Sequence, residues 1–79
     1  MPCFHLNLIG DDVVRDDEGH DLPDLSAAID RAVMSAREIV ADRIVAGEVA
    51  RLGDRIEIAG ADGRVMHVVV FADVVRFAD

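Results

Sequence analysis

The sequence is poor in large aromatic residues and in cysteine: it has no tryptophan, no tyrosine, three phenylalanines and one cysteine. Three phenylalanine rings add little bulk to a hydrophobic core, and a single cysteine excludes an internal disulfide. A chain of 79 residues also forms at most one domain. We therefore expect a single domain over residues 1–79 that gains stability by self-association.

Long apolar runs are missing as well. The longest uninterrupted run, residues 68–72, has five residues, whereas a membrane-spanning helix needs roughly 20. The first residues contain neither a basic segment nor the apolar stretch of a secretory signal. The sequence thus predicts no membrane partner. It also predicts a cytoplasmic location, where a lone thiol such as Cys3 stays reduced.

Positive charge is scarce. Eight arginines and no lysine stand against sixteen acidic residues, which gives a net charge of −8. Nucleic acids and anionic membranes bind basic surfaces, so neither is an expected partner. Seven of the acids fall in the segment 11–24, where only Arg15 offsets them. This acidic segment is a candidate for solvated turns, for a cation site or for contact with a basic partner.

What the sequence does contain is one long amphipathic segment, residues 24–46. Its apolar residues recur every three or four positions: Leu25, Ala28, Ile29, Ala32, Val33, Ala36, Ile39 and Val40. This spacing predicts a helix with one apolar stripe. Asp and Pro residues at 21–24 are typical of a helix start, and Gly47 is typical of the residue after a helix.

Strand patterns lie on both sides of this helix. Alternating or apolar residues predict strands at about 3–9, 12–16, 54–59 and 64–71. The fold class is therefore α+β: a four-stranded antiparallel sheet in the order β-β-α-β-β, with the helix packed on one face. The tail 73–79 is compatible with an extension of the last strand or with a short helix.

The last strand is apolar on both faces, as is typical of a strand covered on both sides. One face would carry Val65, His67, Val69 and Phe71, and the other Met66, Val68 and Val70. A single helix covers only one face of the sheet, so the exposed face predicts an interface. The interface predicted first comprises His5, Val65, His67, Val69 and Phe71. If Val65, Val69 and Phe71 instead face the helix, then Met66, Val68 and Val70 are outermost.

Several segments resemble an uncharacterised family of small bacterial proteins, a domain of unknown function. The matching segments are residues 4–8, 16–25, 27–28, 62–65 and 70–75. The Gly-x-x-Leu-Pro-Asp-Leu segment at 19–25 carries most of the specificity. The resemblance implies the β-β-α-β-β order. It implies no activity and no catalytic residue.

Candidate metal ligands are few. His5 and His67, with Cys3 on the same predicted face as His5, would form a transition-metal site if the first and last strands were adjacent. The more common role of such residues is as ordinary polar positions on a sheet. The acidic segment 11–24 does not fit the spacing of a known calcium loop, and turns and helix starts also select Asp.

Signs of catalysis are weaker still. Cys3 with His5 is the one conceivable nucleophile and base pair, but residues two apart on a strand share a face without guaranteed contact. No phosphate-binding loop, Cys-x-x-Cys or His-Glu-x-x-His occurs. We expect no enzyme and no cofactor. Arg43, at the centre of the apolar stripe near the helix end, is expected to lie along the core with its guanidinium at the helix carbonyl end. The alternative role is a buried anchor for a carboxylate or phosphate.

The sequence therefore favours a small, non-enzymatic, homodimeric protein-interaction module, with room for a further protein partner. The alternative is a protein that binds a small ligand or a divalent metal through His5 and His67 on the outer sheet face or through the acidic turns at 11–24.

Overall fold

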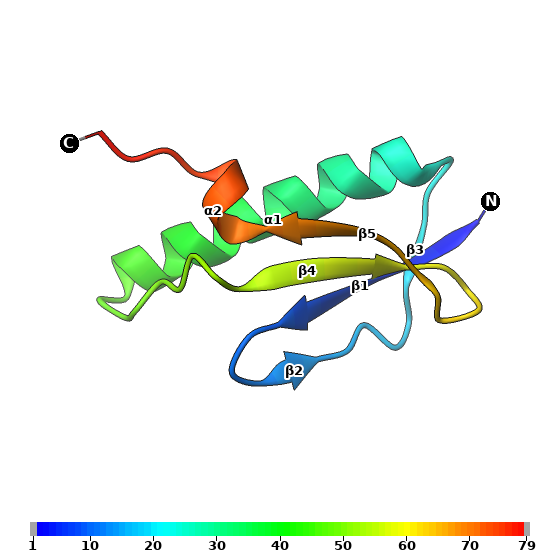
Figure 1. Cartoon of the computed structure of the whole chain (residues 1–79), viewed down its shortest axis with the longest axis horizontal. Coiled ribbons are helices and arrows are strands. Elements are labelled where there is room, and N and C mark those ends of the chain that lie inside the picture. The colour runs from blue at the N-terminus through cyan, green and yellow to red at the C-terminus, as the bar shows by residue number, and fades with distance from the viewer. Residues whose placement is uncertain (1, 79) are drawn as a thin grey trace.

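Two strand patterns precede the long helix and two follow it, and a computed structural model that describes residues 2–78 confirms this α+β layout (Figure 1). The elements in chain order are β1 (Cys3–Ile9), β2 (Val13–Val14), β3 (His20–Asp21), α1 (Leu25–Val45), β4 (Arg55–Ala59), β5 (Val65–Val70) and α2 (Phe71–Val74). Within residues 2–78, no helix combines the length and the apolar character that a membrane span requires.

All strand pairs are antiparallel, and the sheet has the order β2-β1-β4-β5. The two-residue strand β3 pairs with the start of β1, on the same edge where β2 pairs with its end. β4 therefore separates β1 from β5. This arrangement leaves β2 and β3 at one edge of the sheet and β5 at the other (Figure 1).

The helix begins and ends where its sequence predicts. The Asp24 carboxylate accepts a hydrogen bond from the Ala27 N–H at 2.8 Å and so caps the first turn. At the other end, Gly47 takes a φ of 74°, a backbone conformation that glycine adopts at no steric cost. The predicted helix 24–46 thus becomes the observed α1 with one flanking residue at each end.

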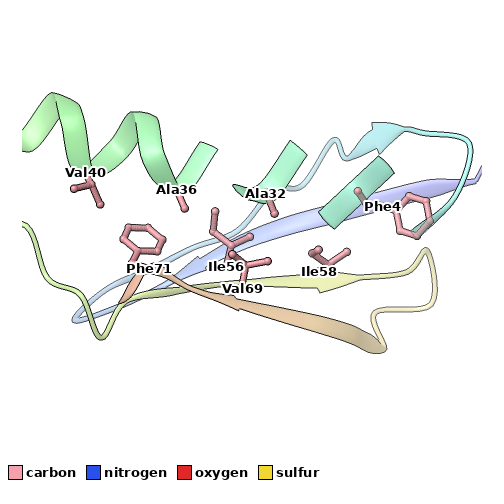
Figure 2. Close-up of a cluster of buried hydrophobic side chains, with 9 residues drawn as sticks. Phe4, Ala32, Ala36, Val40, Ile56, Ile58, Val69 and Phe71 are labelled. Atoms are coloured by element: carbon pink, nitrogen blue, oxygen red, sulfur yellow. The ribbon is translucent and has the colours of Figure 1, made fainter. Parts of the chain in front are cut away.

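The core lies between α1 and the helix-facing side of the sheet (Figure 2). Small residues Ala28, Ala32 and Ala36 form the buried stripe of the helix, and they allow its backbone to approach the sheet closely. Opposite them lie the larger side chains of Phe4, Ile56, Ile58, Val69 and Phe71. Ile56 and Ile58 come from β4, which lies between β1 and β5 in the sheet. The bulk of this core therefore comes from the sheet side.

The pairing of β5 with β4 corrects the first prediction of the outer sheet face. Val69 lies opposite Ile56, and His67 lies opposite Ile58. Because Ile56 and Ile58 face the helix, Val69 and His67 lie on the helix-facing side of the sheet.

The prediction that His67, Val69 and Phe71 lie on the outer face is therefore wrong, and Val69 and Phe71 are buried in the core. The second register is the observed one for Val68, Val69, Val70 and Phe71. Its placement of Val65 toward the helix is wrong, because Val65 lies opposite Ala59, the partner of the outer-face residue His5. Val68 and Val70 lie on the outer face opposite Glu57 and Arg55.

Two features at the ends of β5 do not follow from the alternation of its residues: a register shift at its start and a short helix after its end. A register shift between Ile58 and Ala59 places Val65 opposite Ala59. After β5 the chain turns into α2, so the helical alternative for the tail applies to its first residues. Residues 75–78 have no regular structure, and residue 79 lies outside the described residues.

Candidate functional site

Asp16 fills a gap in the sheet edge. β3 pairs with the start of β1 and β2 pairs with its end, and neither reaches the middle of the strand. There the Leu6 N–H donates to the Asp16 carboxylate at 3.1 Å, and the Asp16 N–H donates to the side-chain oxygen of Asn7 at 2.9 Å. The Asp16 carboxylate thus accepts the backbone hydrogen bond from Leu6 that a paired strand would otherwise accept.

Gly19 closes the turn that holds Asp16 in this position. The Gly19 N–H donates to the second oxygen of the Asp16 carboxylate at 3.0 Å. Gly19 has a φ of 77°, and a β-carbon at this position would lie 2.5 Å from the Cys3 sulfur. Both the backbone conformation and the lack of space therefore require glycine here.

Two histidines surround the same aspartate. His5 Nδ1 lies 2.6 Å from the backbone oxygen of Asp16, and His20 Nε2 lies 3.2 Å from its carboxylate. A carbonyl oxygen only accepts hydrogen bonds, so His5 Nδ1 carries the proton. The other ring nitrogen of His5 faces the Cys3 sulfur at 3.8 Å. We refer to Cys3, His5, Asp16, Gly19 and His20 as the Asp16 cluster.

The cluster changes the acidity of its central residue. Burial by itself would raise the pKa of Asp16, but the hydrogen bonds from the Leu6 and Gly19 N–H groups outweigh it. Together with the nearby His20 and His5, they hold the pKa of Asp16 below its ordinary value of 3.8. The ionised carboxylate is therefore the form that the fold requires.

A polar hollow of about 220 Å³ lies beside the cluster, between β1 and the turn after β4. Its polar lining comes from His5, Asn7, Arg15, Asp16 and Asp17. Among residues 2–78, no three histidine, cysteine or acidic side chains come together in a way that would hold a metal ion.

The predicted meeting of His5 and His67 is wrong. The two histidines lie on opposite faces of the sheet, and β4 separates their strands. Cys3 and His5, in contrast, do come together, as the distance of 3.8 Å between Sγ and Nε2 shows. His67 therefore does not belong to a metal site with His5 and Cys3. Any ligand bound on the outer face of the sheet would contact His5 without His67.

The acidic segment has a local structural role at several positions. Asp11 pairs with Arg51 at 3.2 Å, Asp16 holds the edge of β1, and Asp24 caps α1. These roles are those expected of Asp in turns and at helix starts. These structural roles explain part of the acidic excess in residues 11–24 without a bound cation.

Arg43 contacts a carboxylate of its own chain. Arg43 lies in the last turn of α1, and its guanidinium is 3.2 Å from the buried side chain of Asp54. Gly10 packs directly against this carboxylate, because a β-carbon there would lie 2.8 Å from it. Arg43 thus forms an ion pair within its own chain at the carbonyl end of α1, and its partner Asp54 immediately precedes β4.

The second candidate site is the edge of β5. Among residues 2–78, β5 pairs with β4 and with no strand on its other side, which we call the free edge of β5. Its side chains are exposed to an unusual degree for apolar residues: 47% for Val65, 48% for Met66 and 39% for Val68. His67 is exposed too, so α1 does not cover this edge. Edges of this kind are templates for pairing with another chain.

A family model described as a domain of unknown function (DUF6894) matches residues 3–72. The chain belongs to this family. The match includes all five strands and α1, and with them both the Asp16 cluster and the free edge of β5. Searches of curated proteins and of solved structures found no match.

Sequence reasoning missed β3 and the role of Asp16 in this family member. The available signal was the Asp-x-x-Gly pattern of residues 16 and 19, which predicts a turn. The pattern does not say that the aspartate reaches Leu6, because that contact spans ten positions. The free edge of β5 was missed because strand order is not contained in the alternation of a single strand.

Proposed function

We propose that this chain is a small, non-enzymatic, homodimeric interaction module of the cytoplasm, and that it associates through β5. The observation that carries the proposal is the exposure of an apolar, uncharged strand at a sheet edge. Val65, Met66 and Val68 are each exposed by more than a third. Soluble proteins usually shield or charge such an edge, and this strand has no charged residue between 65 and 70.

The net charge supports β5 over the opposite edge of the sheet. Two copies with a charge of −8 repel each other, so contact is favoured where acids are sparse. Val13 and Val14 in β2 are also exposed, but acids lie on both sides of this two-residue strand, at positions 11, 12, 16 and 17. β5 is three times as long and carries no acid.

Light scattering coupled to size exclusion tests this proposal. At tens of micromolar, the wild-type chain is expected to have twice the 8.6 kDa mass of one chain. Val68→Lys is expected to weaken the dimer roughly a hundredfold, because a lysine on an edge strand opposes pairing and the symmetric contact contains it twice. Val68 lies on the exposed outer face, so the monomer should keep its circular dichroism spectrum.

The matched control is Val14→Lys, which adds the same charge at a valine of 59% exposure on the opposite edge. It is expected to leave the mass unchanged. A monomeric wild-type chain at this concentration would remove the proposal. Equal loss of dimer in both variants would mean that charge, and not β5, governs association.

A further inference from the structure

The direction of the backbone groups in β5 follows from one hydrogen bond at its end. The Phe71 N–H donates to the Asp54 oxygen at the start of β4 at 2.9 Å. Backbone N–H and C=O groups alternate sides along a strand. Val69 therefore also points its backbone groups toward β4, and Val68 and Val70 point theirs outward. The free edge of β5 thus presents outward-pointing hydrogen-bonding groups at Val68 and Val70.

We propose that a second copy of the chain pairs with this edge in antiparallel fashion, with Val68 of one copy opposite Val68 of the other. The inference rests on the proposed homodimer and specifies how it forms. The two five-stranded sheets would join into one continuous sheet through β5, with both α1 helices on the same face. Edge-to-edge addition of this kind gains its affinity from main-chain hydrogen bonds.

The charges at the two ends of β5 select the antiparallel direction. Arg64 immediately precedes the strand, and Asp73 follows it in α2. Antiparallel pairing places Arg64 of one copy near Asp73 of the other, which is an attractive contact made twice. Parallel pairing would instead place the two Arg64 side chains together and the two Asp73 side chains together.

The same charges select the register. Val68 is the outward-pointing residue nearest the middle of β5, so the central pairing is Val68 with Val68. The nearest alternative slips this register by two residues and places Met66 opposite Val68. With Val68 at the centre, Arg64 lies just beyond the Val70 end of β5 of the other copy, where the chain enters α2 and carries Asp73. In the second register, Arg64 lies opposite Val70 and farther from Asp73.

The chosen register also aligns the apolar side chains. Val70 of one copy falls opposite Met66 of the other, on both sides of the central pair of Val68. Met66 and Val68, which are exposed on one chain, would then contact apolar neighbours. The hydrophobic contact and the main-chain hydrogen bonds therefore favour the same arrangement.

Disulfide trapping tests the geometry. In a Cys3→Ser background, Val68→Cys is expected to form a disulfide-linked dimer for most of the protein under mild oxidation with copper phenanthroline. Hydrogen-bonded antiparallel partners have Cα atoms about 5.5 Å apart, which is within the range of about 4.4–6.8 Å that a disulfide spans. Val14→Cys in the same background, although more exposed than Val68, is expected to trap little.

The outcomes separate this inference from the proposed function. A wild-type dimer with no excess trapping at Val68→Cys over Val14→Cys would overturn the β5 pairing and leave the homodimer intact. Preferential trapping at His67→Cys would overturn the register in favour of Met66 opposite Val68. A wild-type chain that is monomeric by light scattering would remove both proposals.

Discussion

Replacing Phe71 by alanine is expected to lower the free energy of unfolding by about 4 kcal/mol. Phe71 is 0% exposed and packs with Val40 and Ala36 of α1 and with Ile56 of β4 (Figure 2). It is one of only three phenylalanines in the chain, and Ala36 is too small to fill the space that the ring would leave. Chemical denaturation at fixed protein concentration measures the loss, since dimer formation makes stability depend on concentration.

Phe77→Ala is the matched control, because it removes the same side chain at a position that is 65% exposed. We expect it to change the unfolding free energy by less than about 0.5 kcal/mol. If Phe71→Ala left stability unchanged and abolished the dimer, the ring would belong to the interface. The first sequence prediction of the outer face would then be right and the core described above wrong.

Replacing Asp16 by alanine is expected to cost about 3 kcal/mol, because its carboxylate accepts two backbone hydrogen bonds as an ion. The donors are the N–H groups of Leu6 and Gly19, at 3.1 and 3.0 Å. In a chain of this size, the loss should lower the melting temperature by roughly 15 °C. Asp17→Ala is the control, since Asp17 is the exposed neighbour with the same charge. An equal effect of both substitutions would contradict the role given to Asp16.

The same residue makes stability depend on acid. The pKa of Asp16 is lowered in the folded chain, so the ionised carboxylate stabilises the fold above the ordinary carboxyl value of 3.8. This stabilisation is lost as the pH falls through the lower folded pKa. The stability difference between wild type and Asp16→Asn should therefore be largest near neutral pH and shrink as the pH falls below 3.8. A difference that stayed constant down to pH of about 2 would mean that Asp16 acts without its charge.

Periodicity in the sequence was sufficient for the elements with a single apolar face. The helix stripe of Ala28, Ala32 and Ala36 and the alternation of β1 predicted α1 and β1 almost to the residue. Each of these elements has one face that must be buried, so the pattern has one solution. His5 and Asn7 accordingly lie on the outer face, as predicted.

Periodicity failed where both faces of an element are apolar. Val69 and Val68 are the same residue type on opposite faces of β5, and alternation does not say which of them meets the helix. The register against Ile56 and Ile58 decides it, and that pairing depends on contacts distant in sequence. The position of β5 at the sheet edge depends on strand order in the same way.

The Asp16 cluster was partly predictable for a similar reason. The turn at residues 16–19 follows from local chemistry, and so does the shared face of Cys3 and His5. That Asp16 reaches across to Leu6 is a property of the folded edge, where β3 and β2 leave one backbone N–H without a strand partner. Local sequence contains the turn but not the gap that the turn fills.

Backbone amide exchange in β5, followed by NMR over a range of protein concentrations, tests the account most directly. The Val68 N–H points away from β4, so it is expected to exchange rapidly in dilute solution and to become protected as the dimer forms. The Val69 N–H, which points toward β4, should be protected throughout. A Val68 amide that exchanges rapidly at every concentration would contradict association through the free edge of β5.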